Sequence, residues 1–281
     1  MICTRPDLSY ALCMTSRYQA NPGEGHWTAV KNILKYLRRT KDVFIVYGGE
    51  EELRIKGYTD ASFQTDKDDS QSQSGFVFCL NGGAVSWKSS KQDTIADSTT
   101  EAEYIAASEA AKEVVWIKKF ITGLGVIPSI SDVVDLYCDN NGAIAQAKEP
   151  RSHQRSKHIL RRFHLIREII DRGDVEICKV HTDDNIADPL TKPLAQQKHD
   201  RHTESLSIRY VVMFYNGVNA PTRMMLDASV NGTLLDKSSE EAFYILDRIA
   251  NNDYQFPTSR LGSGRRTPGK LDLDTNDSVS A

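Results

Sequence analysis

The stretch Gly57-Tyr58-Thr59-Asp60-Ala61-Ser62 closes a run of alternating residues and places a carboxylate, Asp60, near the end of an expected strand. Three further acids, Glu101, Asp139 and Asp188, each stand at the end of a strand pattern or at the start of a helix pattern. Side chains at such positions can point from a sheet edge into a shared cleft. Carboxylates that close raise each other's pKa unless cations neutralise them. The sequence therefore predicts a metal site around Asp60.

The composition is that of an ordinary globular protein, with 40% hydrophobic and 26% charged residues among 281. The net charge of -3 conceals two basic stretches, at 31–41 and 148–172. Any interaction with nucleic acid must therefore come from local patches and not from the overall charge.

The cysteines favour a reducing compartment. There are five of them, an odd number, and they are widely separated without metal-ligand spacing. No apolar run is long enough to cross a bilayer, and the N-terminal residues lack the apolar centre of a signal peptide. We expect a cytoplasmic or nuclear protein with no membrane association.

Alternating apolar residues begin at position 53 and predict three strands, at 53–59, 75–80 and 84–88. Asn81-Gly82-Gly83 between the last two strands is typical of a hairpin turn. Two more strands are expected at 134–138 and 175–180, each after a helical segment. Three antiparallel strands followed by crossover units predict an α/β fold, with a mixed five-stranded sheet flanked by helices.

The expected helices have recognisable ends. Ser98 and Glu101 form a capping box at the start of the longest one, and Gly123 with Gly125 ends it. Shorter helices are expected at 140–147, at 158–171 and from about 185, where Pro189 and Pro193 keep the last one short or irregular.

Two of the acids also have purely structural explanations. A capping Glu101 satisfies a backbone donor and needs no further role. Asp139 stands where a helix N-cap is expected, a position that Asp commonly fills. Glu103 competes with Glu101 for the metal-site position.

Six motifs together resemble the ribonuclease H domain of copia-type retrotransposon Pol polyproteins. They occur in that family's order and spacing over about residues 50–195. The resemblance implies a ribonuclease H-like fold that hydrolyses the RNA strand of RNA–DNA hybrids. The motifs are Tyr58-Thr59-Asp60-Ala61-Ser62, Ser86 to Gln92, Ser98 to Tyr104, Cys138-Asp139-Asn140, Ser156-Lys157-His158-Ile159 and Asn185 to Lys192.

The same resemblance implies catalytic, metal-binding acids at Asp60, Glu101, Asp139 and Asp188. Glu101 is preferred to Glu103 because it directly follows Thr100 at the helix start. Two Mg²⁺ ions would suit this chemistry, because Mg²⁺ prefers oxygen ligands and a metal pair can activate water and stabilise the leaving group. Mn²⁺ is a possible substitute. His181 stands where relatives commonly carry another residue, and we interpret it as a chance substitution.

Recognition of an RNA–DNA hybrid should depend on groove shape and on contacts to the backbone. The charges of a basic helix often only face solvent. Lys157, Arg161 and Arg162 are therefore as compatible with no binding role as with phosphate contacts. The candidate substrate contacts are Lys88, Ser89, Ser90, Lys91, Gln92, Asn140, Lys157, Arg161 and Arg162.

The two ends of the chain differ from its centre. Residues 1–48 resemble the end of a copia-type reverse transcriptase, but the Tyr-x-Asp-Asp motif of a polymerase is absent, so DNA synthesis is not expected. Within a predicted segment 209–256, residues 213–256 resemble part of the Gag protein of gypsy-type plant retrotransposons. That segment predicts two short helices, at 222–228 and 240–250, and possible self-association. Residues 257–281 are expected to be disordered.

Three functional hypotheses follow from these observations. The leading one is a metal-dependent endonuclease that cuts RNA–DNA hybrids. The second is a non-catalytic nucleic-acid-binding remnant of a chimeric transposon polyprotein, and the third is an interaction protein acting through the Gag-like segment.

Overall fold

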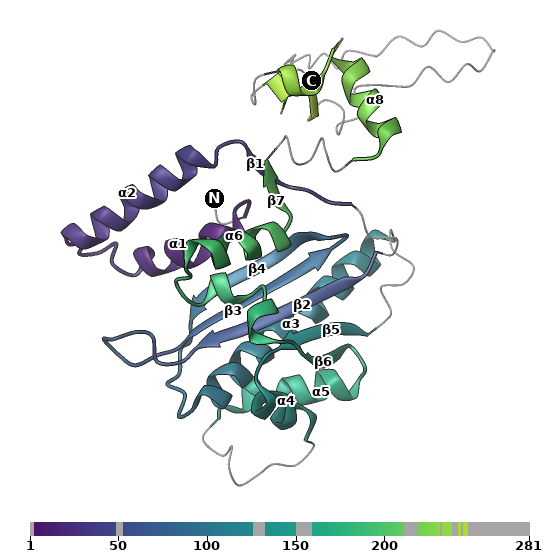
Figure 1. Cartoon of the computed structure of the whole chain (residues 1–281). Coiled ribbons are helices and arrows are strands. Elements are labelled where there is room, and N and C mark those ends of the chain that lie inside the picture. The colour runs from purple at the N-terminus through teal and green to yellow at the C-terminus, as the bar shows by residue number, and fades with distance from the viewer. Residues whose placement is uncertain are drawn as a thin grey trace, which may run out of the picture.

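A mixed five-stranded sheet forms the centre of the computed structural model, with strand order β4-β3-β2-β5-β6 (Figure 1). The structure describes residues 3–48, 53–125, 133–149, 159–210, 218–230, 232–237, 241–242 and 244–246. Strands β2, β3 and β4 are antiparallel neighbours, whereas β5 runs parallel to β2, and β6 runs parallel to β5. The predicted α/β fold is confirmed, with strands at β2 Ile55–Ser62, β3 Gln73–Leu80, β4 Gly83–Lys91, β5 Val134–Cys138 and β6 Val175–Lys179.

The hairpin between β3 and β4 forms where it was predicted. Asn81 has φ of 51° and Gly82 has φ of 80°, so both residues adopt the left-handed backbone that a tight two-residue turn requires. Glycine adopts this conformation without steric cost, and asparagine tolerates it better than most residues.

One face of the sheet is covered by α3 (Thr99–Leu124), α4 (Asn141–Lys148) and α5 (Leu165–Asp171). The longest helix begins as predicted, because the Ser98 side chain accepts a hydrogen bond from the Glu101 N–H. It ends at Gly125, which has φ of 65°. Buried side chains of α3 and α5, among them Tyr104 and Ile166, form the main core with the sheet.

The predicted basic helix at 158–171 is shorter than expected. Leu160 is extended, with φ of -59° and ψ of 134°, so regular helix cannot run through it. A 3-10 turn at Arg161–Phe163 follows, and α5 begins only at Leu165. The buried Phe163 ring anchors this turn in the core.

Segments from both ends of the chain pack on the opposite face of the sheet (Figure 1). These are α1 (Ser9–Ser16), α6 (Gln196–Ser205), and the short strands β1 (Val43–Ile45) and β7 (Ile208–Tyr210), while α2 (Glu24–Arg39) packs on α1. Strands β1 and β7 pair antiparallel in a separate small sheet. The sequence had not predicted α6 or β7, and both lie beyond the expected limit of the ribonuclease H-like domain at residue 195.

A buried ion pair ties the N-terminal segment to the central sheet. The Arg17 guanidinium lies 2.9 Å from the carboxylate of Asp66, in the connection between β2 and β3, and also donates to the side chain of Gln73 on β3. Both charged side chains are largely buried, at 16% and 5% exposure. Residues 3–48 are therefore packed against the central sheet as part of the same structure.

The C-terminal segment contains the predicted helix around 222–228 as α8 (Ala220–Ser229). Its Leu226 packs with Leu234 and Ala242, and Phe44 lies against this small cluster. The second predicted helix of this segment, at 240–250, falls mostly outside the described residues, as does the predicted disordered tail at 257–281. Among the helices that the structure describes, none is long and apolar enough to cross a membrane.

Candidate metal centre

Three carboxylates that are far apart in sequence meet at one point of the sheet. Asp60 comes from β2, Asp139 follows β5, and Asp188 begins the 3-10 turn Asp188–Leu190. One oxygen from each lies within 4.8 Å of the others. The parallel pairing of β2 with β5 places Thr59 opposite Cys138, so the residues that follow each, Asp60 and Asp139, emerge side by side.

The turn that carries Asp188 is fastened to the sheet by buried polar contacts. The Asn185 side chain donates to the carbonyl oxygen of Thr59 at 2.9 Å and accepts from the Ala187 N–H at 3.2 Å. The Thr191 hydroxyl donates to Asp60, joining the end of the turn to the central acid. These bonds hold the Asp188 side chain, which is 0% exposed, beside Asp60.

Close packing against Gly75 reinforces this position. Gly75 pairs with Asp60 across β2 and β3. A Cβ atom at Gly75 would lie only 2.7 Å from the Leu190 Cβ and 2.7 Å from the Thr191 Cγ2. The absence of a side chain therefore allows the turn to approach the sheet.

Glu103 and Glu101 occupy different environments on α3. Glu103 is 6% exposed, and its carboxylate lies within 4.8 Å of ligand atoms of Cys138 and Asp139. The Glu101 carboxylate instead accepts the backbone N–H of Asp97 at 2.9 Å, which is a helix-capping contact. The structure therefore brings Glu103 to the acidic cluster and does not bring Glu101 there.

The capping explanation for Asp139 does not apply, because the neighbouring Asn140 caps α4. The Asn140 side chain accepts from the Ala143 N–H at 3.0 Å. The Asp139 carboxylate is thus available to the cluster with Asp60 and Asp188.

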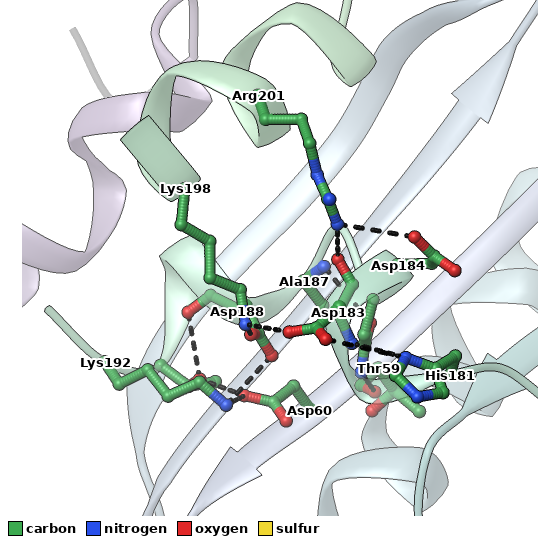
Figure 2. A network of polar contacts seen from close by, with 12 residues as sticks. Thr59, Asp60, His181, Asp183, Asp184, Ala187, Asp188, Lys192, Lys198 and Arg201 are labelled. Atoms are coloured by element: carbon green, nitrogen blue, oxygen red, sulfur yellow. Dashed lines mark hydrogen bonds and ion pairs between the residues drawn. The ribbon is translucent and has the colours of Figure 1, made fainter. Parts of the chain in front are cut away.

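Two lysines that the sequence reading did not select neutralise part of this charge (Figure 2). The Lys192 ammonium lies 2.9 Å from Asp188 and 3.4 Å from Asp60. The Lys198 ammonium, supplied by α6, lies 2.9 Å from the other oxygen of Asp188. The spacing of four residues between Asp188 and Lys192 could have indicated this ion pair from the sequence. Lys198 reaches the site only because α6 packs beside it.

Burial and the neighbouring carboxylates raise the pKa values of two acids in the cluster. Burial raises the pKa of Asp60 to about 6, and the charges of Asp188 and Asp139 add to the effect, while Lys192 and the Thr191 hydroxyl oppose it. Burial, together with Asp60 and Asp139, raises the pKa of Glu103 well above its ordinary value. Such a cluster favours binding of additional cations.

The donor set fits a hard divalent ion. The converging ligands are carboxylate oxygens, which Mg²⁺ and Mn²⁺ prefer. Cys138 lies nearby, but burial raises the pKa of its thiol, so it stays protonated and is a poor ligand at neutral pH.

Several of the candidate substrate contacts have structural partners. Gln92 is buried and donates to Ser74 and to the carbonyl of Ala102, so it holds β3 and α3 together. Lys91 pairs with Asp66 at 2.7 Å and with Asp69 at 2.5 Å.

The other candidates differ in their contacts and exposure. Lys88 lies 3.9 Å from Glu109, and the Ser89 hydroxyl donates to the carbonyl of Leu190, whereas Ser90 is partly exposed on β4. Arg161 is exposed, and Arg162 pairs with Asp93 at 2.5 Å. Lys157 lies outside the described residues. His181 is exposed and accepts from the Asp183 N–H at the start of a 3-10 turn.

The structure thus combines a mixed α/β sheet with three carboxylates that converge at strands β2 and β5. No protein-family model matches the chain. The chain is 44% identical over 200 residues to the retrovirus-related Pol polyprotein from transposon TNT 1-94 of Nicotiana tabacum, covering 71% of this chain and 15% of that protein. It is 37% identical over 215 residues to the polyprotein from transposon RE2 of Arabidopsis thaliana, covering 76% of this chain and 15% of that protein.

The chain therefore contains a Pol-derived region with a ribonuclease H-like fold, and it spans a small part of the length of these relatives. Among solved structures, LC11-RNase H1 isolated from compost aligns with 53% of this chain and 96% of its own, with a TM-score of 0.38 and 18% identity.

Proposed function

We propose that this chain is a retrotransposon-derived endonuclease that hydrolyses the RNA strand of RNA–DNA hybrids. The observation that carries the proposal is the convergence of Asp60, Asp139 and Asp188, with oxygen atoms within 4.8 Å of one another. A fold needs no such arrangement for stability, because buried like charges oppose folding. The unfavourable free energy of burying three like charges is explained if the site binds cations that neutralise them.

In this proposal Asp60, Glu103, Asp139 and Asp188 would hold two Mg²⁺ ions, with Mn²⁺ as a substitute. When bound, such ions would supply an activated water and stabilise the departing oxygen of the phosphodiester. The chain contributes rigid placement of the ligands: Thr191 orients the Asp60 carboxylate, and Asn185 holds the Asp188 turn on β2. Glu103 replaces Glu101 as the proposed ligand from α3.

The proposed substrate contacts act on the nucleic-acid backbone. Lys88, Ser90, Asn140 and Arg161 remain candidates, while Lys91 and Gln92 more directly support the protein structure through their own contacts. Phosphate contacts of this kind would make hybrid binding weaker as salt concentration rises.

The first experiment measures cleavage of a labelled RNA–DNA hybrid by the whole chain, with and without Mg²⁺. Single-stranded RNA and an RNA duplex serve as controls. Hybrid-specific, Mg²⁺-dependent cutting that is lost in Asp60→Asn supports the proposal. A folded chain that binds the hybrid without cutting it supports the non-catalytic remnant instead.

Self-association through the Gag-like segment is a separate prediction from sequence resemblance. Light scattering over a concentration series would compare the whole chain with a chain ending at residue 210. Assembly that depends on the missing segment supports it, and equal masses for both chains contradict it.

A further inference from the structure

The Asp188 carboxylate is held by two ammonium groups from different elements. Lys192 lies in the same segment as Asp188, whereas Lys198 belongs to α6 on the opposite face of the sheet from α3. Each ammonium lies 2.9 Å from one of the two carboxylate oxygens (Figure 2). Since the Asp188 side chain is 0% exposed, solvent screens these attractions less than it screens an ion pair on the surface.

Lys198 also has a second acceptor within reach. Its ammonium lies 3.3 Å from the carboxylate of Asp183, and the Asp183 side chain is 65% exposed. Figure 2 shows the Lys198 ammonium between Asp183 and Asp188. The lysine side chain can therefore leave Asp188 and keep a partner, at the cost of exchanging a buried acid for an exposed one.

A divalent cation bound to Asp188 must share or take the oxygen that Lys198 now contacts. Two cations close to one oxygen repel each other, and less water is present to screen them in a buried site. We propose that Lys198 is a built-in counter-ion that competes with the divalent metal at Asp188 and transfers to Asp183 when the metal binds. This inference rests on the proposed function, in which Asp188 is a metal ligand.

The proposal gives α6 a role in setting the metal affinity of the site. Without metal, Lys198 offsets the buried charge of Asp188 and holds α6 against the 3-10 turn. With metal, the same contact is lost, so part of the metal's binding free energy is spent on breaking it. Removing the ammonium should therefore tighten metal binding and weaken the metal-free fold.

The test measures Mn²⁺ affinity by electron paramagnetic resonance on the whole chain. Lys198→Met keeps the length of the side chain and removes its charge, and it should lower the Mn²⁺ Kd about fivefold. Lys198→Arg keeps the charge and should stay near wild type. The matched control is Arg201→Met, which removes a cation from the same helix that contacts Asp184 and not Asp188.

A second measurement needs no variant that could misfold. Acetylation of lysines in the wild-type chain, followed by mass spectrometry, reports how accessible each ammonium is. Addition of Mn²⁺ should speed the labelling of Lys198 at least about twofold while labelling of the exposed Lys88 stays constant. Labelling of Lys198 that is unchanged or slower with Mn²⁺ overturns the proposal.

Asp188→Asn separates the two levels of inference. If this variant binds Mn²⁺ as tightly as wild type, Asp188 is not a ligand and the metal assignment fails with everything built on it. If it weakens Mn²⁺ binding while Lys198→Met leaves the Kd unchanged or raises it, the metal site stands and the competition by Lys198 is refuted.

Discussion

Glu101 and Glu103 lie only two residues apart on α3, yet their carboxylates serve different partners. Glu101 accepts the N–H of Asp97 at 2.9 Å, and Glu103 is buried beside the acids at the end of β2 and β5. Positions i and i+2 of a helix point to different sides, so both residues cannot reach the same cluster. A single turn of α3 therefore carries one capping carboxylate and one carboxylate of the acidic cluster.

Exchange of each acid for its amide tests that division. Glu103→Gln should reduce Mg²⁺-dependent cleavage of the hybrid about 100-fold or more, because a proposed metal ligand loses its charge. Glu101→Gln should keep cleavage within about threefold, since the amide oxygen can still accept the Asp97 N–H. The measurement is a single-turnover cleavage assay on both variants. Equal losses would contradict the assignment.

The close approach at Gly75 predicts that a single methyl group there disturbs the site. Gly75→Ala places a Cβ 2.7 Å from Leu190 and Thr191, which should displace the turn carrying Asp188. We expect a loss of about 1–3 kcal/mol in the free energy of unfolding and about tenfold or more in cleavage rate. Gly123→Ala is the control, because its Cβ would meet no atom within 4 Å. That change should stabilise α3 by up to about 1 kcal/mol.

The raised pKa of Asp60 predicts how metal-free stability depends on pH. Burial raises this pKa from 3.8 to about 6, so the folded chain binds a proton that the unfolded chain has lost. Stability therefore falls as pH rises from about 4 to about 6. Asp60→Asn removes the effect and should gain up to about 3 kcal/mol over wild type at pH 7 in a chelator.

Urea denaturation of wild type and Asp60→Asn at pH 4 and pH 7 measures this difference. Comparing the two proteins cancels the titration of groups that they share. Adding Mg²⁺ at pH 7 should stabilise the wild type and reduce the advantage of the variant, since the ion neutralises the ionised site. If wild type and Asp60→Asn differ by the same free energy of unfolding at pH 4 and pH 7, the pKa of Asp60 is not raised in the folded chain.

The ion pair between Arg17 and Asp66 predicts that the N-terminal segment stabilises the central sheet. Arg17→Met leaves the largely buried Asp66 with fewer partners and should cost about 1–3 kcal/mol. Arg162→Met is the matched comparison, because its pair with Asp93 is 48% and 61% exposed, and it should cost no more than about 1 kcal/mol. Urea denaturation of both variants checks the contrast.

Much of the fold could be predicted because its signals are local. Alternation at 53–59, the Asn81-Gly82 turn and the Ser98 cap each depend on a few adjacent residues. Helix α6 has no such signal, since its ten residues are polar and only His202 is buried, at 1% exposure. Strands β1 and β7 are three residues each, too short for a period to be recognised. Their structure depends on contacts between distant parts of the chain.

The sequence also predicted part of the candidate site. Asp60, Asp139 and Asp188 follow motifs whose order and spacing are visible in the sequence, and the structure brings all three together. The choice between Glu101 and Glu103 depends on the rotation of α3 about its axis, which the motif does not specify. Lys198 could not be foreseen, because its proximity to Asp188 requires that α6 be placed first.

The pairing of β1 with β7 has a consequence for synthesis on the ribosome. In the sequence these strands lie on either side of the five-stranded sheet, so β1 lacks its partner β7 until Tyr210 has left the exit tunnel. Chains emerge from their N-terminus, and contacts between distant residues form late. Helix α6, with the lysine that reaches Asp188, also emerges in this last stage. The acidic cluster thus gains Lys198 only after translation has moved beyond α6, so Asp188 lacks this counter-ion until the last of these segments has emerged.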